Sequence, residues 1–286
     1  MQKILLSLFT LLILVSCSTK KINQPSENHS SIEYQSLSDQ ALDLKSIHAL
    51  GGLPTSKEKI RVLEYKNYIV GFSDKYKLPL YTQRNFKDYP KDCSEKGRGA
   101  SIFTPDSRLP KNLQLTQDDF DDPNCKSKDK KIRTEKCLRR GHLTANADVC
   151  THSDRKETFK TTNIAPQIQN SFNSGLWSSL EKCVQQWAKQ DPKLIVNTGI
   201  IFDESPKLLN NKVPIPKYFY KIILRPNSNE RIAFLMENKH YKKNEKGVSR
   251  YKTTVDKIES LTRMDFLPQF NKGLNGSYNN TSLNCD

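Results

Sequence analysis

The chain has 286 residues, of which 35% are hydrophobic and 27% charged, and its mean hydropathy is -0.70. This length allows one large or two small domains, and the polar composition excludes a protein built mainly from membrane spans. A formal net charge of +15 predicts an acidic polymer such as nucleic acid as the partner, although basic surfaces also serve solubility or adhesion to anionic lipid.

The first sixteen residues have the pattern of an export signal. A basic start precedes an apolar run over residues 4–15, which is too short for a membrane span of about 20 residues. The run ends at Leu14-Val15-Ser16-Cys17, which resembles the bacterial lipobox, in which the cysteine is lipidated and becomes the mature N-terminus. We therefore expect residues 1–16 to be a lipoprotein signal peptide, the alternative being an ordinary signal peptide with a chance cysteine.

A lipid anchor at Cys17 would hold the protein on a membrane of the bacterial cell envelope. Ser18, where an Asp would suggest inner-membrane retention, favours the outer membrane, on its periplasmic or surface face. The mature chain keeps a net charge of +14, because residues 1–16 contain one lysine.

Residues 17–48 are expected to be a tether with a short helix at its end. The stretch to about residue 37 is rich in Ser, Asn, Gln and Lys and has too few large apolar residues to fold. A helix is predicted at about residues 39–48, capped by Ser38 and ended by Gly51-Gly52. Residues 49–286 are then one folded domain.

The domain opens with three predicted strands, at residues 61–64, 68–72 and 78–83, which form an antiparallel meander. The polar stretch 84–136 contains four prolines and is predicted to be largely loop. Its basic run at 126–136 could bind phosphates, although a solvated charged loop is the commoner meaning of such a run.

A helix is predicted over residues 173–189, because apolar residues recur there at helical spacing and Asp191-Pro192 ends the pattern. Trp177 and Trp187 on it are assigned to the core. Further strands are predicted at 194–202, 218–224 and 232–235, and a second helix at 254–262. This order of elements predicts an α+β fold with a central antiparallel sheet, flanking helices and long loops.

Apart from Cys17 the chain has six cysteines, and an exported protein can oxidise them to as many as three disulfides. Sequence alone does not choose among the fifteen possible pairings. A zinc site built from Cys137, His142, Cys150 and His152 is disfavoured, because the spacing does not match known structural zinc sites. The six cysteines are Cys93, Cys125, Cys137, Cys150, Cys183 and Cys285.

The run Arg139-Arg140-Gly141-His142 supplies two groups that phosphodiester hydrolysis requires, a base for water and a cation for the phosphate. Imidazole has an ordinary pKa of about 6.5 and suits the first task, so His142 is the candidate base. Arg140 would share its face if the segment were extended, and Gly141 would let the backbone bend to aim both at one phosphate.

Asn173 and Glu181 supply oxygen atoms of the kind that magnesium prefers. On a continuous helix they lie eight residues apart, roughly 80° round the axis, so both could approach one region. Taken singly, each residue has a commoner explanation: a lone histidine is more often structural, and an asparagine at the start of a helix is more often an N-cap. A glutamate on a helix is usually solvated. The ordered combination is what indicates a site.

These segments, together with Thr162-Asn163-Ile164-Ala165-Pro166-Gln167, resemble the active-site region of the DNA/RNA non-specific endonucleases, the ββα-metal or His-Me finger nucleases related to endonuclease G. The resemblance covers about 220 residues, roughly 49–270. It continues through the segments 50–54, 68–72, 78–81, 196–199, 213–221 and 254–259.

The resemblance implies a ββα-metal nuclease fold with His142 as general base and Asn173 as the single direct ligand of Mg²⁺, or of Mn²⁺. It implies that Glu181 holds water bound to the metal, and that Arg140 and Asn163 support the phosphate and the geometry of the site. DNA and RNA would bind through their phosphate backbones, with little sequence preference, and cleavage would leave 5′-phosphate ends.

Two features depart from the family pattern. Arg139 stands where the family usually has Asp, and the spacer from residue 167 to residue 173 is one residue longer than usual. The first leaves a second hypothesis open, a nucleic-acid-binding envelope lipoprotein with impaired catalysis. A third is a structural lipoprotein that neither binds nor cleaves nucleic acid.

Overall fold

The computed structural model describes residues 47–87, 97, 100–228, 230–269 and 285. The expected signal peptide, Cys17 and nearly all of the tether lie outside these ranges. Of the helix predicted at 39–48, the described part is one 3-10 turn at Ile47–Ala49. No helix in the described ranges is both long and apolar enough to cross a membrane.

A seven-stranded sheet forms the centre of the domain, and every neighbouring pair in it is antiparallel. The predicted meander is confirmed as three adjacent strands, and the strands predicted at 194–202, 218–224 and 232–235 lie beside it. In spatial order the strands are β12 (Lys252–Thr253), β11 (Glu230–Glu237), β10 (Tyr218–Arg225), β7 (Ile195–Ile201), β4 (Leu78–Asn85), β3 (Ile69–Ser73) and β2 (Arg61–Glu64).

Three small antiparallel pairs accompany the main sheet. They are β1 (Thr55–Ser56) with β13 (Met264–Asp265), β5 (Leu138–His142) with β6 (Ile164–Ile168), and β8 (Leu208–Leu209) with β9 (Val213–Pro214). The β5–β6 pair matters most for function, because it carries the Arg-Gly-His motif. It was not predicted as a hairpin, since β5 lacks alternating apolar residues and β6 contains a proline.

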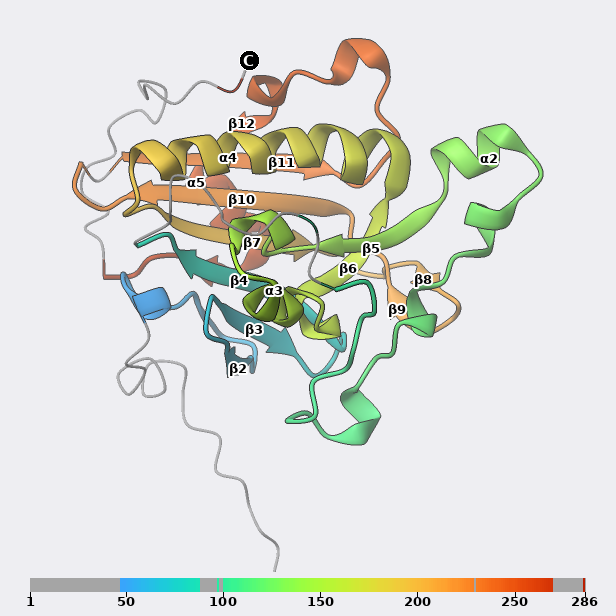
Figure 1. Cartoon of the computed structure of the whole chain (residues 1–286), viewed down its shortest axis with the longest axis horizontal. Coiled ribbons are helices and arrows are strands. Elements are labelled where there is room, and N and C mark those ends of the chain that lie inside the picture. The colour runs from blue at the N-terminus through green and yellow to red at the C-terminus, as the bar shows by residue number, and fades with distance from the viewer. Residues whose placement is uncertain (1–46, 88–96, 98–99, 229, 270–284, 286) are drawn as a thin grey trace, which may run out of the picture. The chain divides into compact units, whose positions relative to one another are not determined.

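Helices cover both faces of the sheet (Figure 1). Helix α4 (Ser178–Gln190) packs over one face through the larger apolar core, which contains Trp177 and Trp187 as predicted. Helix α5 (Val255–Thr262) contributes to a second core, in which Ile258 is fully buried. The remaining helices are α2 (Lys130–Glu135), α3 (His152–Thr158), the wide π-helical segment η7 (Gln169–Trp177) and 3-10 turns at Lys111–Leu113, Asp118–Phe120, Pro123–Lys126, Asn146–Asp148, Thr161–Asn163, Lys243–Glu245 and Val248–Tyr251.

The prediction of one continuous helix over residues 173–189 is wrong. Segment η7 leads into α4 through Gly175, whose φ of -114° and ψ of -106° are not helical. Asn173 and Glu181 therefore lie on two helical segments joined by a kink, and the regular 80° relation does not apply.

Disulfides connect distant parts of the chain. Cys125 bonds Cys137 across twelve residues, and Cys183 on α4 bonds Cys285 near the C-terminus. Cys150 is disulfide-bonded as well, whereas Cys93 lies outside the described residues. Since Cys137 and Cys150 are oxidised, the disfavoured zinc site is ruled out.

Candidate active site

Four of the five predicted site residues line one cavity of about 550 Å³ between the β5–β6 pair and the kinked η7–α4 helix. They are Arg140, His142, Asn173 and Glu181. The rest of the wall is formed by Ser101, Phe103, Arg139, Gln169, Ser174 and Ser178. Residues separated by about forty positions in the sequence thus meet in one polar cleft.

Strand β5 presents Arg140 and His142 on the same side, because successive side chains of a strand alternate. The imidazole of His142 lies beside two buried phenyl rings. Its centroid is 5.5 Å from the ring of Phe103 and 5.2 Å from that of Phe159, which it meets edge to face. The imidazole therefore packs against these two rings where it lines the cavity.

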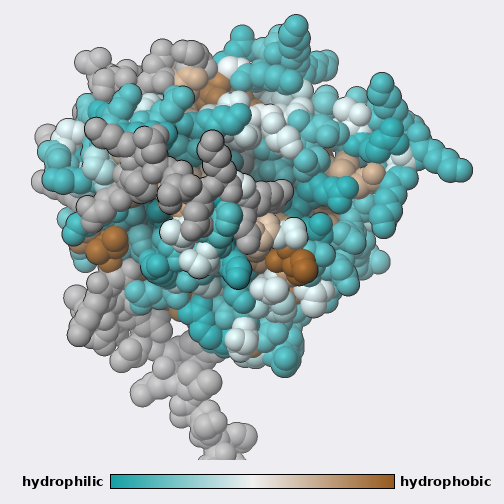
Figure 2. Space-filling model, viewed as in Figure 1, coloured by the Kyte–Doolittle hydropathy of each residue, from teal (hydrophilic) through white to brown (hydrophobic). Residues whose placement is uncertain are grey.

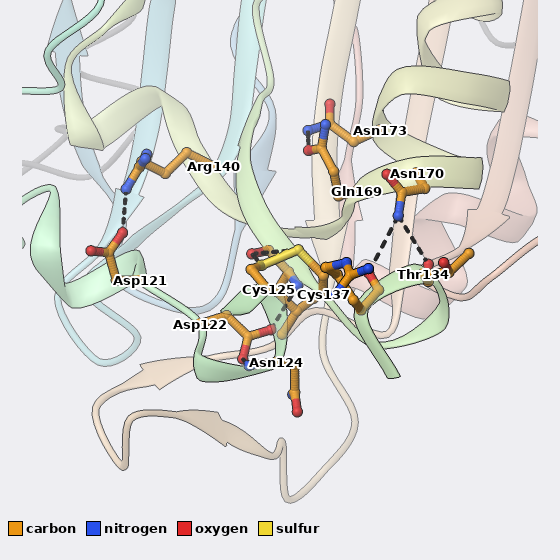
Figure 3. The surroundings of a disulfide bond; sticks show 12 residues. Asp121, Asp122, Asn124, Cys125, Thr134, Cys137, Arg140, Gln169, Asn170 and Asn173 are labelled. Carbon is orange, nitrogen blue, oxygen red and sulfur yellow. Dashed lines mark hydrogen bonds and ion pairs between the residues drawn. A yellow bond between two sulfur atoms is a disulfide. The ribbon is translucent and has the colours of Figure 1, made fainter. Parts of the chain in front are cut away.

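Arg140 is held in place by three neighbours. Its Nη1 donates hydrogen bonds to Asp121 Oδ1 at 2.9 Å and to the carbonyl oxygen of Gln117 at 3.1 Å, and its guanidinium lies 5.2 Å from the centre of the Phe103 ring. Figure 3 shows the pair with Asp121. A cation held in this way can neutralise a phosphate without first being ordered.

The structure gives Gly141 a different role from the predicted bend. The residue sits in the regular β5–β6 ladder opposite Ala165. A Cβ on Gly141 would lie 2.2 Å from Oε1 of the fully buried Gln167, so a glycine is required to make room for that side chain.

Asn173 is oriented by its neighbour Gln169. The Nδ2 atom of Asn173 donates to Gln169 Oε1 at 3.1 Å (Figure 3). Gln169 Nε2 in turn donates to Ser174 Oγ at 2.7 Å. Since the amide nitrogen is directed at Gln169, the Oδ1 atom points the other way and is available to a cation. Asn173 lies inside η7 rather than at its start, so it is not an N-cap.

Glu181 is half-buried in the first turn of α4. Burial raises the pKa of its carboxyl to about 8; the Lys221 ammonium opposes this rise, and the Asp148 carboxylate adds to it. Lys221 is itself buried, donates to Thr198 Oγ1 at 2.7 Å and lies 5.0 Å from the centre of the Trp177 ring. A cation bound in the cavity would favour the charged form of Glu181.

Asn163 does not line the cavity. It is fully buried behind β5, where its Oδ1 accepts from Thr144 N at 2.9 Å and its Nδ2 donates to the carbonyl oxygens of Thr144 and Thr158, each at 2.9 Å. Its own carbonyl accepts from Leu143 N at 2.9 Å. Asn163, grouped with the catalytic residues from the sequence, is therefore a positioning residue that fixes the chain just after His142.

A family model described as DNA/RNA non-specific endonuclease matches residues 52–272, which is well over half of the chain. The chain belongs to this family. The antiparallel β5–β6 pair followed by the helix that carries Glu181 corresponds to a ββα arrangement, and the predictions of the family, of the α+β fold and of a nuclease are confirmed.

Relatives and solved structures agree with this assignment. Nuclease C1 of Cunninghamella echinulata is 24% identical over 184 residues, which are 60% of this chain and 68% of that one. A nuclease of Nostoc sp. is 34% identical over 140 residues, 45% of this chain and 50% of that one. The endonuclease G chain in a crystal structure with the inhibitor EndoGI has a TM-score of 0.66 at 19% identity and covers 78% of this chain and 91% of its own, so the two share the fold.

DNA/RNA non-specific endonucleases depend on a divalent metal, and the donor atoms of this cavity fit one. Asn173 presents an amide oxygen and Glu181 a carboxylate, and Mg²⁺ prefers oxygen ligands while keeping several waters. No group of three or more His, Cys, Asp or Glu side chains that could hold a metal occurs among the residues the structure describes.

Substituting Asn163 tests the positioning role. Asn163→Ala leaves three buried backbone groups without their partner, so we expect the free energy of unfolding to fall by about 2–4 kcal/mol and the hydrolysis rate to fall with it. Urea unfolding and turnover should be measured on the same preparation. An Asn163→Ala protein as stable as the parent but inactive would contradict the positioning role and indicate direct participation.

The sequence did not reveal that three further residues interact with the site residues, namely Gln169, Asp121 and Lys221. Both Gln169 and Asp121 are ordinary surface residue types. Gln169 lies four residues before Asn173 on the same helical segment, whereas only the fold brings Asp121 beside Arg140. Lys221 did leave a signal, because it is a charged residue inside the apolar strand β10. Such a residue is buried only where partners surround it.

Proposed function

We propose that this non-specific endonuclease is a lipid-anchored, extracytoplasmic enzyme that hydrolyses phosphodiester bonds of DNA and RNA with little sequence preference. The observation that carries the proposal is the cavity that brings together the imidazole of His142, the guanidinium of Arg140, the amide of Asn173 and the carboxyl of Glu181. These are the groups that metal-assisted hydrolysis of a phosphodiester requires.

Each side chain has a separate task. His142 takes the proton of the attacking water, and Arg140 neutralises the phosphate. Asn173 would be the single direct protein ligand of a divalent ion, Mg²⁺ or Mn²⁺, and Glu181 would hold water bound to that ion. The ion would supply Lewis-acid stabilisation of the developing charge. Contacts of this kind address the phosphate backbone and not the base edges, which supports weak sequence preference.

The first test is a digestion assay. Purified mature protein is incubated with supercoiled plasmid, single-stranded DNA or RNA, with Mg²⁺ or Mn²⁺ and with or without EDTA. We expect all three substrates to be degraded, EDTA to stop the reaction, and the products to carry 5′ phosphates. No cleavage with either ion would contradict the proposal.

The anchor rests on the lipobox at Leu14–Cys17 and is tested separately. Cells expressing the chain are grown with a labelled fatty acid and fractionated. We expect label on the parent protein and none on Cys17→Ser, which should leave the membrane fraction. Equal labelling of both forms would exclude lipidation at Cys17.

A second candidate is a nucleic-acid-binding lipoprotein with impaired catalysis. It is favoured by one observation, that Arg139 is exposed and lines the cavity where the family usually carries Asp. Arg139→Asp separates the two candidates. If Arg139 is compatible with catalysis, we expect no gain in kcat on plasmid DNA from Arg139→Asp. A gain of a hundredfold or more would support an impaired site.

A further inference from the structure

Residues 125–137 form a projection next to the active site, here called the basic finger. The Cys125–Cys137 disulfide closes its base, and helix α2 occupies its tip. In Figure 1 the finger extends from the end of β5 away from the central sheet. In Figure 2 the same projection is mostly hydrophilic.

The finger carries a strong positive charge. Among its thirteen residues are six basic and two acidic ones, a net charge of +4. All six basic side chains are exposed, and none of them takes part in the ion pairs found among the described residues. The six are Lys126, Lys128, Lys130, Lys131, Arg133 and Lys136.

Helix α2 of the finger adds no side chain to the apolar core. Helix α2 has six residues and none of them is buried, and a helix this short is not stable alone. Polar contacts hold it instead: Asp129 Oδ1 accepts from the backbone nitrogens of Lys131 and Ile132, and Arg133 Nη1 donates to the carbonyl of Ser127 at 2.6 Å. A helix that is held by polar contacts and contributes nothing to the core is suited to a role at the surface.

The finger is also hydrogen-bonded to segment η7, which carries Asn173. Asn170 Nδ2, on η7, donates to the carbonyl oxygens of Arg133 and Thr134, each at 3.3 Å (Figure 3). Asn170 lies three residues before Asn173, and Cys137 directly precedes strand β5. The exposed Arg139 follows at the cavity wall, so positive charge extends from the finger to the catalytic groups.

We propose that the basic finger binds the phosphate backbone of the nucleic acid beside the cleavage site. The inference rests on the proposed function and deepens it. Lysines on a finger closed at its base contact phosphates that do not react, and so increase the affinity for long substrates. A nucleic acid is favoured over an anionic membrane because the finger adjoins the cavity that would hold the reacting phosphate.

The test compares two triple variants of the mature protein. K128Q/K130Q/K131Q removes three charges from the finger, and K57Q/K189Q/K193Q removes three exposed lysines elsewhere. Binding to a labelled 30-base-pair duplex is measured in EDTA over a range of salt concentrations. For the finger variant we expect affinity to fall about tenfold and the slope of log K against log salt to shrink by about 2 to 3, roughly 0.9 for each lost contact. The control should match the parent.

A second measurement ties binding to turnover. The ratio of kcat/KM on the duplex to that on bis(p-nitrophenyl) phosphate, which is too small to reach the finger, should fall about tenfold in the finger variant. Equal affinity and an equal ratio in both variants would overturn the proposal. So would an equal loss on both substrates, or lost binding to phosphatidylglycerol vesicles with unchanged duplex binding. If the parent binds but never cleaves, the proposed function fails while the finger is still tested by the salt slope.

Discussion

Replacing His142 by alanine is expected to lower the hydrolysis of plasmid DNA by about 10²–10⁴-fold, the usual contribution of a positioned general base. The imidazole is the base brought into the cavity by β5, and it lies beside the rings of Phe103 and Phe159. Turnover of the purified variant at saturating substrate measures the effect, because removal of the base should lower kcat rather than raise KM.

A matched control is His152→Ala. His152 is the exposed first residue of α3 and does not line the cavity, so its loss should leave kcat close to that of the parent. The far-ultraviolet circular dichroism and melting temperature of His142→Ala should match those of the parent. A folded His142→Ala protein with more than a tenth of the parent rate would remove His142 from the role of base.

Asn173→Ala is expected to weaken divalent-metal binding and to lower turnover by about 10²–10³-fold. The amide nitrogen of Asn173 is bonded to Gln169, so the carbonyl oxygen is the atom it offers to a cation. Loss of that oxygen removes a stabilisation of about 3–4 kcal/mol, and each 1.4 kcal/mol corresponds to a factor of ten. Titration calorimetry with Mg²⁺ and electron paramagnetic resonance with Mn²⁺ measure binding directly, independent of turnover.

Two further variants sharpen this result. Gln169→Ala should give a smaller loss, about tenfold, because Asn173 keeps its oxygen but loses the contact that orients it. Asn244→Ala, an exposed asparagine in the turn Lys243–Glu245, should bind metal as the parent does. If Asn173→Ala bound Mn²⁺ with the parent affinity, the metal would have to be held elsewhere.

Much of the fold could be predicted because it depends on local patterns. The meander from β2 to β4 follows from short apolar strands separated by turn residues, and α5 follows from its apolar spacing and the Thr254 cap. The β5–β6 hairpin could not be predicted in this way. Strand β5 consists mostly of charged residues and glycine, and β6 includes Pro166, so pairing depends on burial against the α4 core.

The prediction of the site had the same limit. The order of Arg140, His142, Asn173 and Glu181 indicated a nuclease, yet the continuous helix invoked to join the last two does not exist. Gly175 breaks it, and the kink brings the two side chains to one cavity. For Asn163 the sequence indicated the residue but not its task. Its hydrogen bonds to backbone groups of Thr144 and Thr158 show that it holds the chain after His142 and does not reach the cavity.

The sequence by itself determined the family, the α+β class and the identity of the groups available for chemistry, because residue types and their order are properties of the chain. Only the tertiary structure decided which groups share a cavity and which way the amide of Asn173 points. It also decided that Glu181 is placed near the charges of Lys221 and Asp148, where burial raises its pKa. Distances, burial and local electric field arise when separate segments pack together, and no local pattern encodes them.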